Sequence, residues 1–233
     1  MFAQTETIKT IKKIGGKELW QLKKEEGIQL QEIKVKHAKI TIEGDGDLVL
    51  NKMNDVVAMD LINARKDKAK RTEKSNVWEE IITSMHWRDG KPTDFSEKGL
   101  VDALTNNAPC ITSFGLLKSF CDSVVRNGID KWSTKFKAGV NVIAKGGLIP
   151  ITFAEHRIDE KLMSPKKGSP VLVHLNRFSG WKATFEISYV ENIYSIEQII
   201  NIIELAGFGC GIGSGRTSGY GRYHVSRENI EIY

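Results

Sequence analysis

The segment Gly207-Phe-Gly-Cys-Gly-Ile-Gly-Ser-Gly-Arg-Thr-Ser-Gly-Tyr-Gly-Arg-Tyr223 is the most unusual part of the 233-residue sequence. Glycine alternates with other residues over positions 207–215 and returns twice before the segment ends. Because glycine adopts positive φ without strain, such a segment forms tight loops and lets another backbone approach closely. Free N–H groups in these loops form concavities for anionic oxygens, and Arg216 and Arg222 carry forked donors suited to phosphate. Residues 207–223 are called the glycine-rich segment below.

Two familiar phosphate-binding loops do not match this segment. The Walker A motif needs a lysine after its last glycine, and none stands here in that register. The dinucleotide motif GxGxxG also fails, because the sixth position counted from each alternating glycine holds isoleucine, serine or arginine. The segment follows a predicted helix at residues 195–206 and precedes a predicted strand at 220–225, which is the reverse of the dinucleotide arrangement. Nucleotide hydrolysis and hydride transfer therefore lose their main support.

Upstream of the segment, hydrophobic patterning predicts a strand region, a long helical block and a second strand region. Apolar and polar residues alternate over residues 33–36 and 38–42, and the phase slips at His37 in the manner of a β-bulge. Helices are predicted at residues 55–71, 76–87, 96–106 and 111–126, and later strands at 137–143, 148–153, 171–175 and 183–189.

This order of elements predicts an α+β fold of the ferredoxin-like, or RRM-like, type, β-α-β-β-α-β. Two parallel central strands, covered on one face by two helices, are expected. The helical block, at about residues 52–130, is expected to be a large insertion at the first crossover. Residues 1–29 are expected to form an N-terminal preface, and residues 30–233 a single domain.

The composition excludes several classes of protein. With 40% hydrophobic residues and five prolines, the chain is neither disordered nor collagen-like. The longest weakly charged stretch, at residues 194–215, holds two glutamates and ends in glycines, so neither a membrane span nor a membrane partner is expected. The first residues lack the layout of a signal peptide. Three cysteines without a CxxC pair indicate neither a disulfide framework nor a zinc site, which fits a cytoplasmic protein.

The spacing of the last glycines resembles that of a known family. Gly211-Ile-Gly213, five residues and then Gly219-Tyr-Gly221 reproduce the GφGxxxxxGφG loop of the RAMP superfamily, the ferredoxin-like RNA-binding proteins of CRISPR systems. The loop is particularly similar to that of the repeating backbone subunits of type III effectors. In that family it lies between the last helix and the last strand, where the element order places it here. The specific match covers residues 195–225, and Arg177-Phe-Ser-Gly-Trp181 is similar to RAMP-like proteins of phages and mobile elements.

The resemblance implies a protein that binds single-stranded RNA or ssDNA, preferentially RNA, in a CRISPR, antiviral-defence or phage context. It also implies self-assembly into a homo-oligomer, or docking with effector-like subunits, because backbone subunits of the family stack head to tail. No cofactor and no metal are expected. Backbone N–H groups and arginines are expected to hold phosphate, while Phe208, Tyr220 or Tyr223 stacks a base. The expected nucleic-acid-binding residues are Gly211, Gly213, Ser214, Gly215, Arg216, Thr217, Gly219, Tyr220, Gly221 and Arg222.

Other interpretations stay open. The glycines alone permit a tight crossover. A metal-independent endoribonuclease of the repeat-processing type is an alternative, with His37 and His86 as candidate general bases. Another is a phage assembly or inhibitor protein that uses the fold for protein contacts. Type III backbone subunits use a loop aspartate, for which Asp45, Asp47 and Asp89 are candidates. Nothing singles out one catalytic residue, so the prediction leans towards a non-catalytic binder.

Two further basic stretches are candidate contact surfaces. Residues 65–74 hold six basic side chains, and Lys166 and Lys167 lie in a loop rich in proline and glycine. Both patterns are also typical of solvated surface, and the net charge of +5 permits an anionic partner without requiring one. Trp181 stands just before an alternating strand and is expected in the core.

Overall fold

The computed structural model describes residues 11–14, 17–20, 33–53, 76–163 and 171–233. The chain divides into two compact units, residues 1–33 and 34–233. In the first unit, β1 (Ile11–Ile14) and β2 (Lys17–Trp20) pair antiparallel. The preface at residues 1–29 and the single domain at 30–233 remain our proposal for the domain organisation. The basic stretch at residues 65–74, and Lys166 and Lys167, lie outside the described residues.

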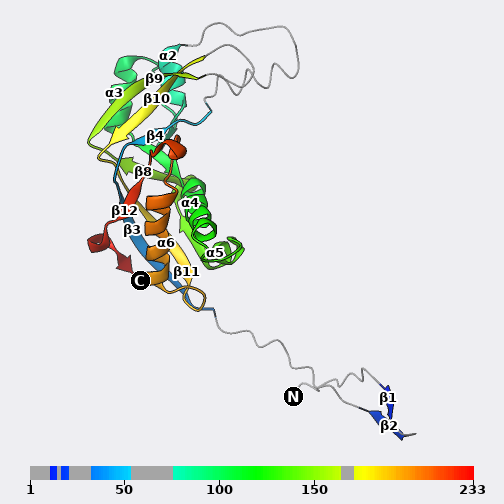
Figure 1. The fold of residues 1–233 in the computed structure, drawn as a ribbon. Coiled ribbons are helices and arrows are strands. Elements are labelled where there is room, and N and C mark those ends of the chain that lie inside the picture. The colour runs from blue at the N-terminus through cyan, green and yellow to red at the C-terminus, as the bar shows by residue number, and fades with distance from the viewer. Residues whose placement is uncertain (1–10, 15–16, 21–32, 54–75, 164–170) are drawn as a thin grey trace. The chain divides into compact units, whose positions relative to one another are not determined.

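The second unit is built around two long antiparallel strands, β3 (Val35–Gly44) and β11 (Lys182–Val190). β12 (Tyr223–Val225) pairs with the other edge of β3, and β7 (Val140–Ile143) pairs with β11, both antiparallel. β3 and β7 therefore run parallel on either side of β11, and β11 and β12 run parallel on either side of β3. This is the strand order of two interleaved β-α-β units (Figure 1).

The predicted α+β class is confirmed, but the expected parallel pair at the centre of the sheet is wrong. Each β-α-β crossover skips one position, so the strand between its two parallel members runs in the opposite direction. The β-bulge at His37 is also wrong, because β3 keeps an unbroken register with β11, with His37 opposite Ser188. The phase slip has another cause: Val35 is 56% exposed, and the core face of β3 begins only at Ala38.

Further strands extend or flank this sheet. Two of them, β5 and β6, lie inside the block that was expected to be helical, so the insertion is a mixed one. Beyond β11 the main sheet continues through β8 (Leu148–Thr152), β6 (Pro109–Thr112) and β5 (His86–Trp87), and β13 (Glu231–Ile232) pairs with β3. A separate sheet has the order β4 (Leu48–Leu50), β10 (Val171–Ser179) and β9 (Glu155–Met163).

Two helices, α4 (Ser113–Arg126) and α6 (Ile196–Gly209), pack against each other on one face of the main sheet (Figure 1). α6 begins with a capping box formed by Ser195 and Gln198, as the sequence predicted. The Thr112 hydroxyl accepts a hydrogen bond from the Gly115 N–H and caps α4. The other helices are α2 (Val77–Thr83), α3 (Glu97–Asn106) and α5 (Thr134–Gly139).

The core lies between this sheet and its helices. Alternate residues of β3 and β11, such as Ile40 and Phe185, are buried against α4 and α6, while their neighbours face away. Trp181 is fully buried, as predicted, and its indole N–H donates to the Gly46 carbonyl. Within the described ranges, no helix is both long and apolar enough to cross a membrane.

Candidate nucleic-acid interface

The glycine-rich segment leaves α6, turns back over the end of β4 and enters β12. Its backbone closes on itself, because the Ile212 N–H donates to the Gly221 carbonyl at 2.9 Å. Gly221 has a φ of +68°, and a Cβ there would stand 1.9 Å from the Ile212 carbonyl oxygen. This position therefore accepts glycine only, which gives one of the glycines a structural reason independent of any ligand.

The segment is also tied to its surroundings through its backbone. The Gly221 N–H donates to the Asp47 carbonyl and the Ser214 N–H to the Val49 carbonyl, both at 2.8 Å. The Ser119 hydroxyl of α4 donates to the Gly211 carbonyl at 2.8 Å. The segment therefore has a fixed path along β4 and α4.

These contacts narrow the set of N–H groups available to a ligand. The Gly211 N–H already donates to Ala206 in the last turns of α6, and the N–H groups of Ile212 and Ser214 are also engaged. Among the described residues, the N–H groups of Gly213 and Gly215 meet no acceptor. The N–H groups of residues 211–215 were all candidates for holding phosphate, and those of Gly213 and Gly215 remain.

Both arginines of the segment make contacts within the protein. An Arg216 amine lies 3.5 Å from the Asp122 carboxylate of α4, and the Arg216 side chain is one third exposed. Arg222 donates to the Phe208 carbonyl at 2.6 Å and so satisfies one of the last carbonyls of α6. Contacts within the protein therefore hold both side chains, and neither is a free surface charge.

The three aromatic residues proposed for base stacking differ sharply in exposure. Tyr223 is 1% exposed and lies in the core, so that candidate is wrong. The Tyr220 ring has the Arg177 guanidinium 5.1 Å from its centroid and lies close to Gly215, so the ring is partly covered. Phe208, in the last turn of α6, is 84% exposed. Phe208 is therefore the stacking candidate of the three.

Arg177 on β10 joins the glycine-rich segment to the β9–β10 hairpin. Besides covering Tyr220, its guanidinium donates to the Asp47 and Asp159 carboxylates, and Asp47 also accepts from Arg157 at 3.0 Å. The hydrogen bond with Asp159 is the main cause of a raised Arg177 pKa, and that with Asp47 adds to it. Sequence reasoning did not assign this role, because Asp47 stands 130 positions away in the chain.

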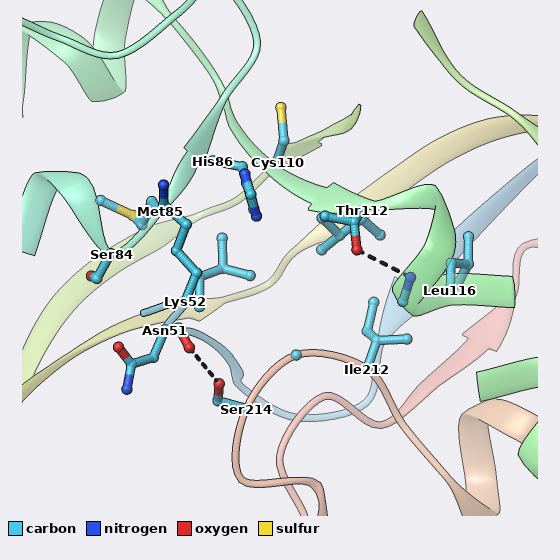
Figure 2. Close-up of a pocket in the computed structure, with 14 residues that line it drawn as sticks. Asn51, Lys52, Ser84, Met85, His86, Cys110, Thr112, Leu116, Ile212 and Ser214 are labelled. Carbon is cyan, nitrogen blue, oxygen red and sulfur yellow. Dashed lines mark hydrogen bonds between the residues drawn. The ribbon is translucent and has the colours of Figure 1, made fainter. Parts of the chain in front are cut away.

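A cavity of about 220 Å³ adjoins the segment (Figure 2). Ile212, Gly213 and Ser214 form one of its walls, and the His86 and Lys52 side chains also line it. Burial, and then the positive charge of Lys52, lower the pKa of His86. His86 is therefore largely neutral at pH 7, in the form that accepts a hydrogen bond.

Asp45 and Asp47 also border the glycine-rich segment, because the Asp45 N–H donates to the Arg222 carbonyl and the Asp47 carbonyl accepts from the Gly221 N–H. The remaining candidates lie elsewhere. His37 contacts Glu186 on the face of the sheet opposite α4 and α6, and His224 contacts Asp45 at 2.6 Å. Asp89 pairs with Arg88 beyond β5. His86 is thus the candidate base that the structure places beside the glycine-rich segment, and the endoribonuclease alternative stays a prediction.

The cysteines are free thiols, and all three are buried. Burial raises the pKa of the Cys110 thiol to about 11, and it also raises those of Cys121 and Cys210. Among the described residues, no group of three or more His, Cys, Asp or Glu side chains is placed to hold a metal ion.

Comparisons with known proteins give matches among solved structures alone. No family model matches the chain, and no curated protein matches it. A chain in the cryo-EM structure of the type III-B Cmr-beta bound to cognate target RNA matches with a TM-score of 0.48 at 12% identity, covering 85% of this chain. This chain spans 61% of that one's length. The crystal structure of Cmr6 from Pyrococcus furiosus matches with a TM-score of 0.27 at 14% identity, covering 84% of this chain and 99% of that one. Both of these matching structures are of Cmr proteins.

Proposed function

We propose that this chain is a RAMP-like protein that binds single-stranded RNA along the glycine-rich segment. One observation carries the proposal: the glycine loop that resembles the RAMP loop lies between α6 and β12, and the last turn of α6 presents Phe208 at 84% exposure, with Arg222 donating to its carbonyl. Exposed aromatic rings beside basic side chains are the common means of holding a single strand.

The expected roles follow from the contacts. Phe208 stacks one base, which contributes about 1–3 kcal/mol in single-strand complexes. Arg216 and Arg222 neutralise phosphates from positions fixed by Asp122 and the Phe208 carbonyl. The N–H groups of Gly213 and Gly215 donate to phosphate oxygens. None of these contacts reads a base edge, so binding is expected to be tolerant of sequence.

The wider role is part of the same proposal. The chain acts as a non-catalytic binder that assembles with copies of itself or with similar subunits, in a CRISPR, antiviral-defence or phage context. The resemblance of the glycine-rich segment to type III backbone subunits supports this role, and single-stranded DNA is a weaker ligand. If the chain is instead a phage assembly or inhibitor protein that uses its fold only for protein contacts, the purified chain is expected to show no affinity for oligonucleotides.

The test is a set of binding isotherms with a fluorescent single-stranded RNA at several salt concentrations. The variant Phe208→Ala is expected to bind about tenfold more weakly, since one stacked base is lost. Arg216→Gln with Arg222→Gln keeps hydrogen-bond donors and removes two charges. In this double variant, the slope of log K against log salt is expected to become less steep by about 1.4.

Matched controls separate the loop from general surface effects. Trp132→Ala removes another exposed aromatic ring, 66% exposed beyond the far end of α4. Arg88→Gln with Lys98→Gln removes two charges from outside the segment. Both controls are expected to bind like the natural sequence. Unchanged affinity and salt slope in the Phe208 and arginine variants would exclude the glycine-rich segment as the binding site.

A further inference from the structure

The cavity beside the glycine-rich segment has a composition that the proposed contacts leave unexplained. Its walls are predominantly apolar, and the side chains that form them are themselves buried. It opens next to the residues that turn over the end of β4 (Figure 2). The apolar wall residues are Leu50, Met85, Ile111, Leu116 and Ile212.

The size of the cavity limits what it can hold. Pockets for drug-sized ligands measure about 300–1,000 Å³, so a cavity of about 220 Å³ suits a smaller group. Since one water has about 30 Å³ of liquid volume, the cavity corresponds to about seven waters. A single flat ring system displaces those waters from apolar walls, which is favourable.

Polar side chains also border this space, among them His86, Thr112 and Lys52 (Figure 2). The His86 imidazole points from β5 into the space between Thr112, Lys52 and Ile212 (Figure 2). A neutral imidazole donates through one nitrogen and accepts through the other. The Lys52 side chain lies close enough to His86 to lower its pKa. Apolar walls bordered by polar side chains, with a cation nearby, match a nucleotide, which has a flat ring, a polar ring edge and a phosphate.

A phosphate group alone fits this space less well. An anion needs several donors to replace its hydration, whereas five Leu, Ile and Met side chains line this space and offer none. The nearest loop N–H without an acceptor among the described residues, that of Gly213, lies where the segment lines the cavity. The phosphate therefore belongs at the mouth, and the ring in the interior.

We propose that this cavity binds one unstacked nucleobase, with His86 hydrogen-bonded to the ring edge and Lys52 facing the attached phosphate. The inference rests on the proposed function in one respect: Ile212, Gly213 and Ser214 belong both to the cavity and to the segment along which the RNA is proposed to lie. A strand that follows the segment turns one base out of its stack and into the cavity. The same chemistry accepts a free nucleoside monophosphate.

Two arms of one experiment distinguish these sources. In the first, calorimetry measures binding of UMP, CMP, AMP and GMP to the full chain, with ribose 5-phosphate and inorganic phosphate as ring-free probes. In the second, a single-stranded RNA is compared with copies that carry one abasic position, moved along the strand. We expect at least one nucleotide to bind where the ring-free probes do not, and one abasic position to weaken binding about tenfold.

Two variants locate the effect. Leu50→Phe fills the cavity, and His86→Ala removes the polar contact at a half-buried residue. Leu205→Phe, on the half-exposed surface of α6, is the matched control for added volume. Thermal unfolding checks that each variant is folded. Loss of nucleotide binding and of the abasic effect in either folded cavity variant, but not in the control, supports the proposal.

The outcomes also separate this inference from the proposed function. If RNA binds through Phe208 and the arginines but every abasic copy binds equally and no nucleotide binds, the cavity proposal is overturned and RNA binding stands. If nucleotides bind in the cavity while no RNA strand binds, the cavity proposal holds for free nucleotides and RNA binding fails. If nucleotide binding persists unchanged in both folded cavity variants, the site lies elsewhere and the proposal is overturned.

Discussion

At the scale of single residues, the glycines of the segment do not all serve one purpose. Gly221 and Gly213 have positive φ and stand against backbone carbonyls, where a side chain has no room. Gly209 is different: it lies in the last turn of α6, and a Cβ there would meet nothing within 4 Å. The run of glycines is therefore only partly explained by the path of the backbone.

Alanine at these two positions is expected to act in opposite directions. Gly221→Ala introduces a side chain at positive φ, 1.9 Å from the Ile212 carbonyl oxygen, and is expected to lower the free energy of unfolding by about 2 kcal/mol or more. Gly209→Ala removes backbone freedom from a helical position and is expected to raise it by about 0.5–1 kcal/mol. Urea unfolding followed by circular dichroism measures both changes. A Gly221→Ala protein as stable as the natural sequence would contradict the described path of the segment.

Residue roles were predictable where the cause was local. Trp181 was expected in the core because an alternating strand follows it, and it is buried. The same alternation over Tyr223, His224 and Val225 indicates that Tyr223 faces the core. Arg177 gave no local signal, because its role depends on partners brought together only by the fold.

At the scale of elements, clear alternation predicted β3, β10 and β11 but not the strands between the helices. β6 has the sequence Pro109-Cys-Ile-Thr112 and continues directly into α4. Its last two residues therefore resemble the start of the helix predicted at residues 111–126. β9 consists mostly of charged side chains and has only a few apolar ones, without a regular alternation. Short or one-sided strands carry little periodic signal, and their pairing is decided by tertiary contacts.

Asn176 on β10 shows how these elements are held together. Its side chain is fully buried and donates to the Ile81 carbonyl of α2 and to the Ser84 hydroxyl. Its carbonyl oxygen lies 2.9 Å from the His156 Nε2 on β9, so neutral His156 donates this bond. One amide thus joins α2, β9 and β10.

This contact makes stability depend on pH. Burial lowers the pKa of His156 below its ordinary value of 6.5, and the hydrogen bond to Asn176 opposes this in part. The unfolded chain therefore binds the proton more readily, so the free energy of unfolding is full above pH 6.5 and falls as the pH drops below it. The contribution of His156 stays under the one-proton limit of about 1.4 kcal/mol per pH unit.

Urea midpoints at several pH values between 7.5 and 5 measure this dependence. The variant His156→Gln keeps an amide donor for Asn176 and has no proton to gain in this range. It is expected to show a shallower fall than the natural sequence, while other titrating groups affect both proteins alike. Equal slopes in the two proteins would exclude His156 as a source of the dependence.

At the scale of the whole molecule, the placement of charged side chains says more about an anionic partner than the total charge does. A formal charge of +5 on 233 residues gave no location for an anionic partner. The fold gathers Lys52, His86 and residues 212–214 around one cavity, although they come from three distant parts of the chain. The glycine-rich segment was recognisable from its sequence because its residues are contiguous. The cavity was not, because its chemistry appears only when β4, β5, β6 and the segment meet.

The domain organisation yields the last prediction. The chain divides into two compact units, residues 1–33 and 34–233. We therefore expect deletion of residues 1–29 to change the free energy of unfolding by no more than about 0.5 kcal/mol, as for surface changes. Deletion of residues 226–233 is the contrasting case, because β13 pairs with β3 and Tyr233 exchanges two backbone hydrogen bonds with His37.

That second deletion is expected to lower the free energy of unfolding by about 1–3 kcal/mol, since it leaves the edge of β3 unpaired along half its length. Thermal and urea unfolding of the two shortened chains, each compared with the full chain, measure the difference. A single cooperative transition at the full-chain midpoint for residues 30–233 supports one independent domain there. If removal of residues 1–29 abolishes the cooperative unfolding transition while removal of residues 226–233 leaves it unchanged, the first unit completes the fold of the second.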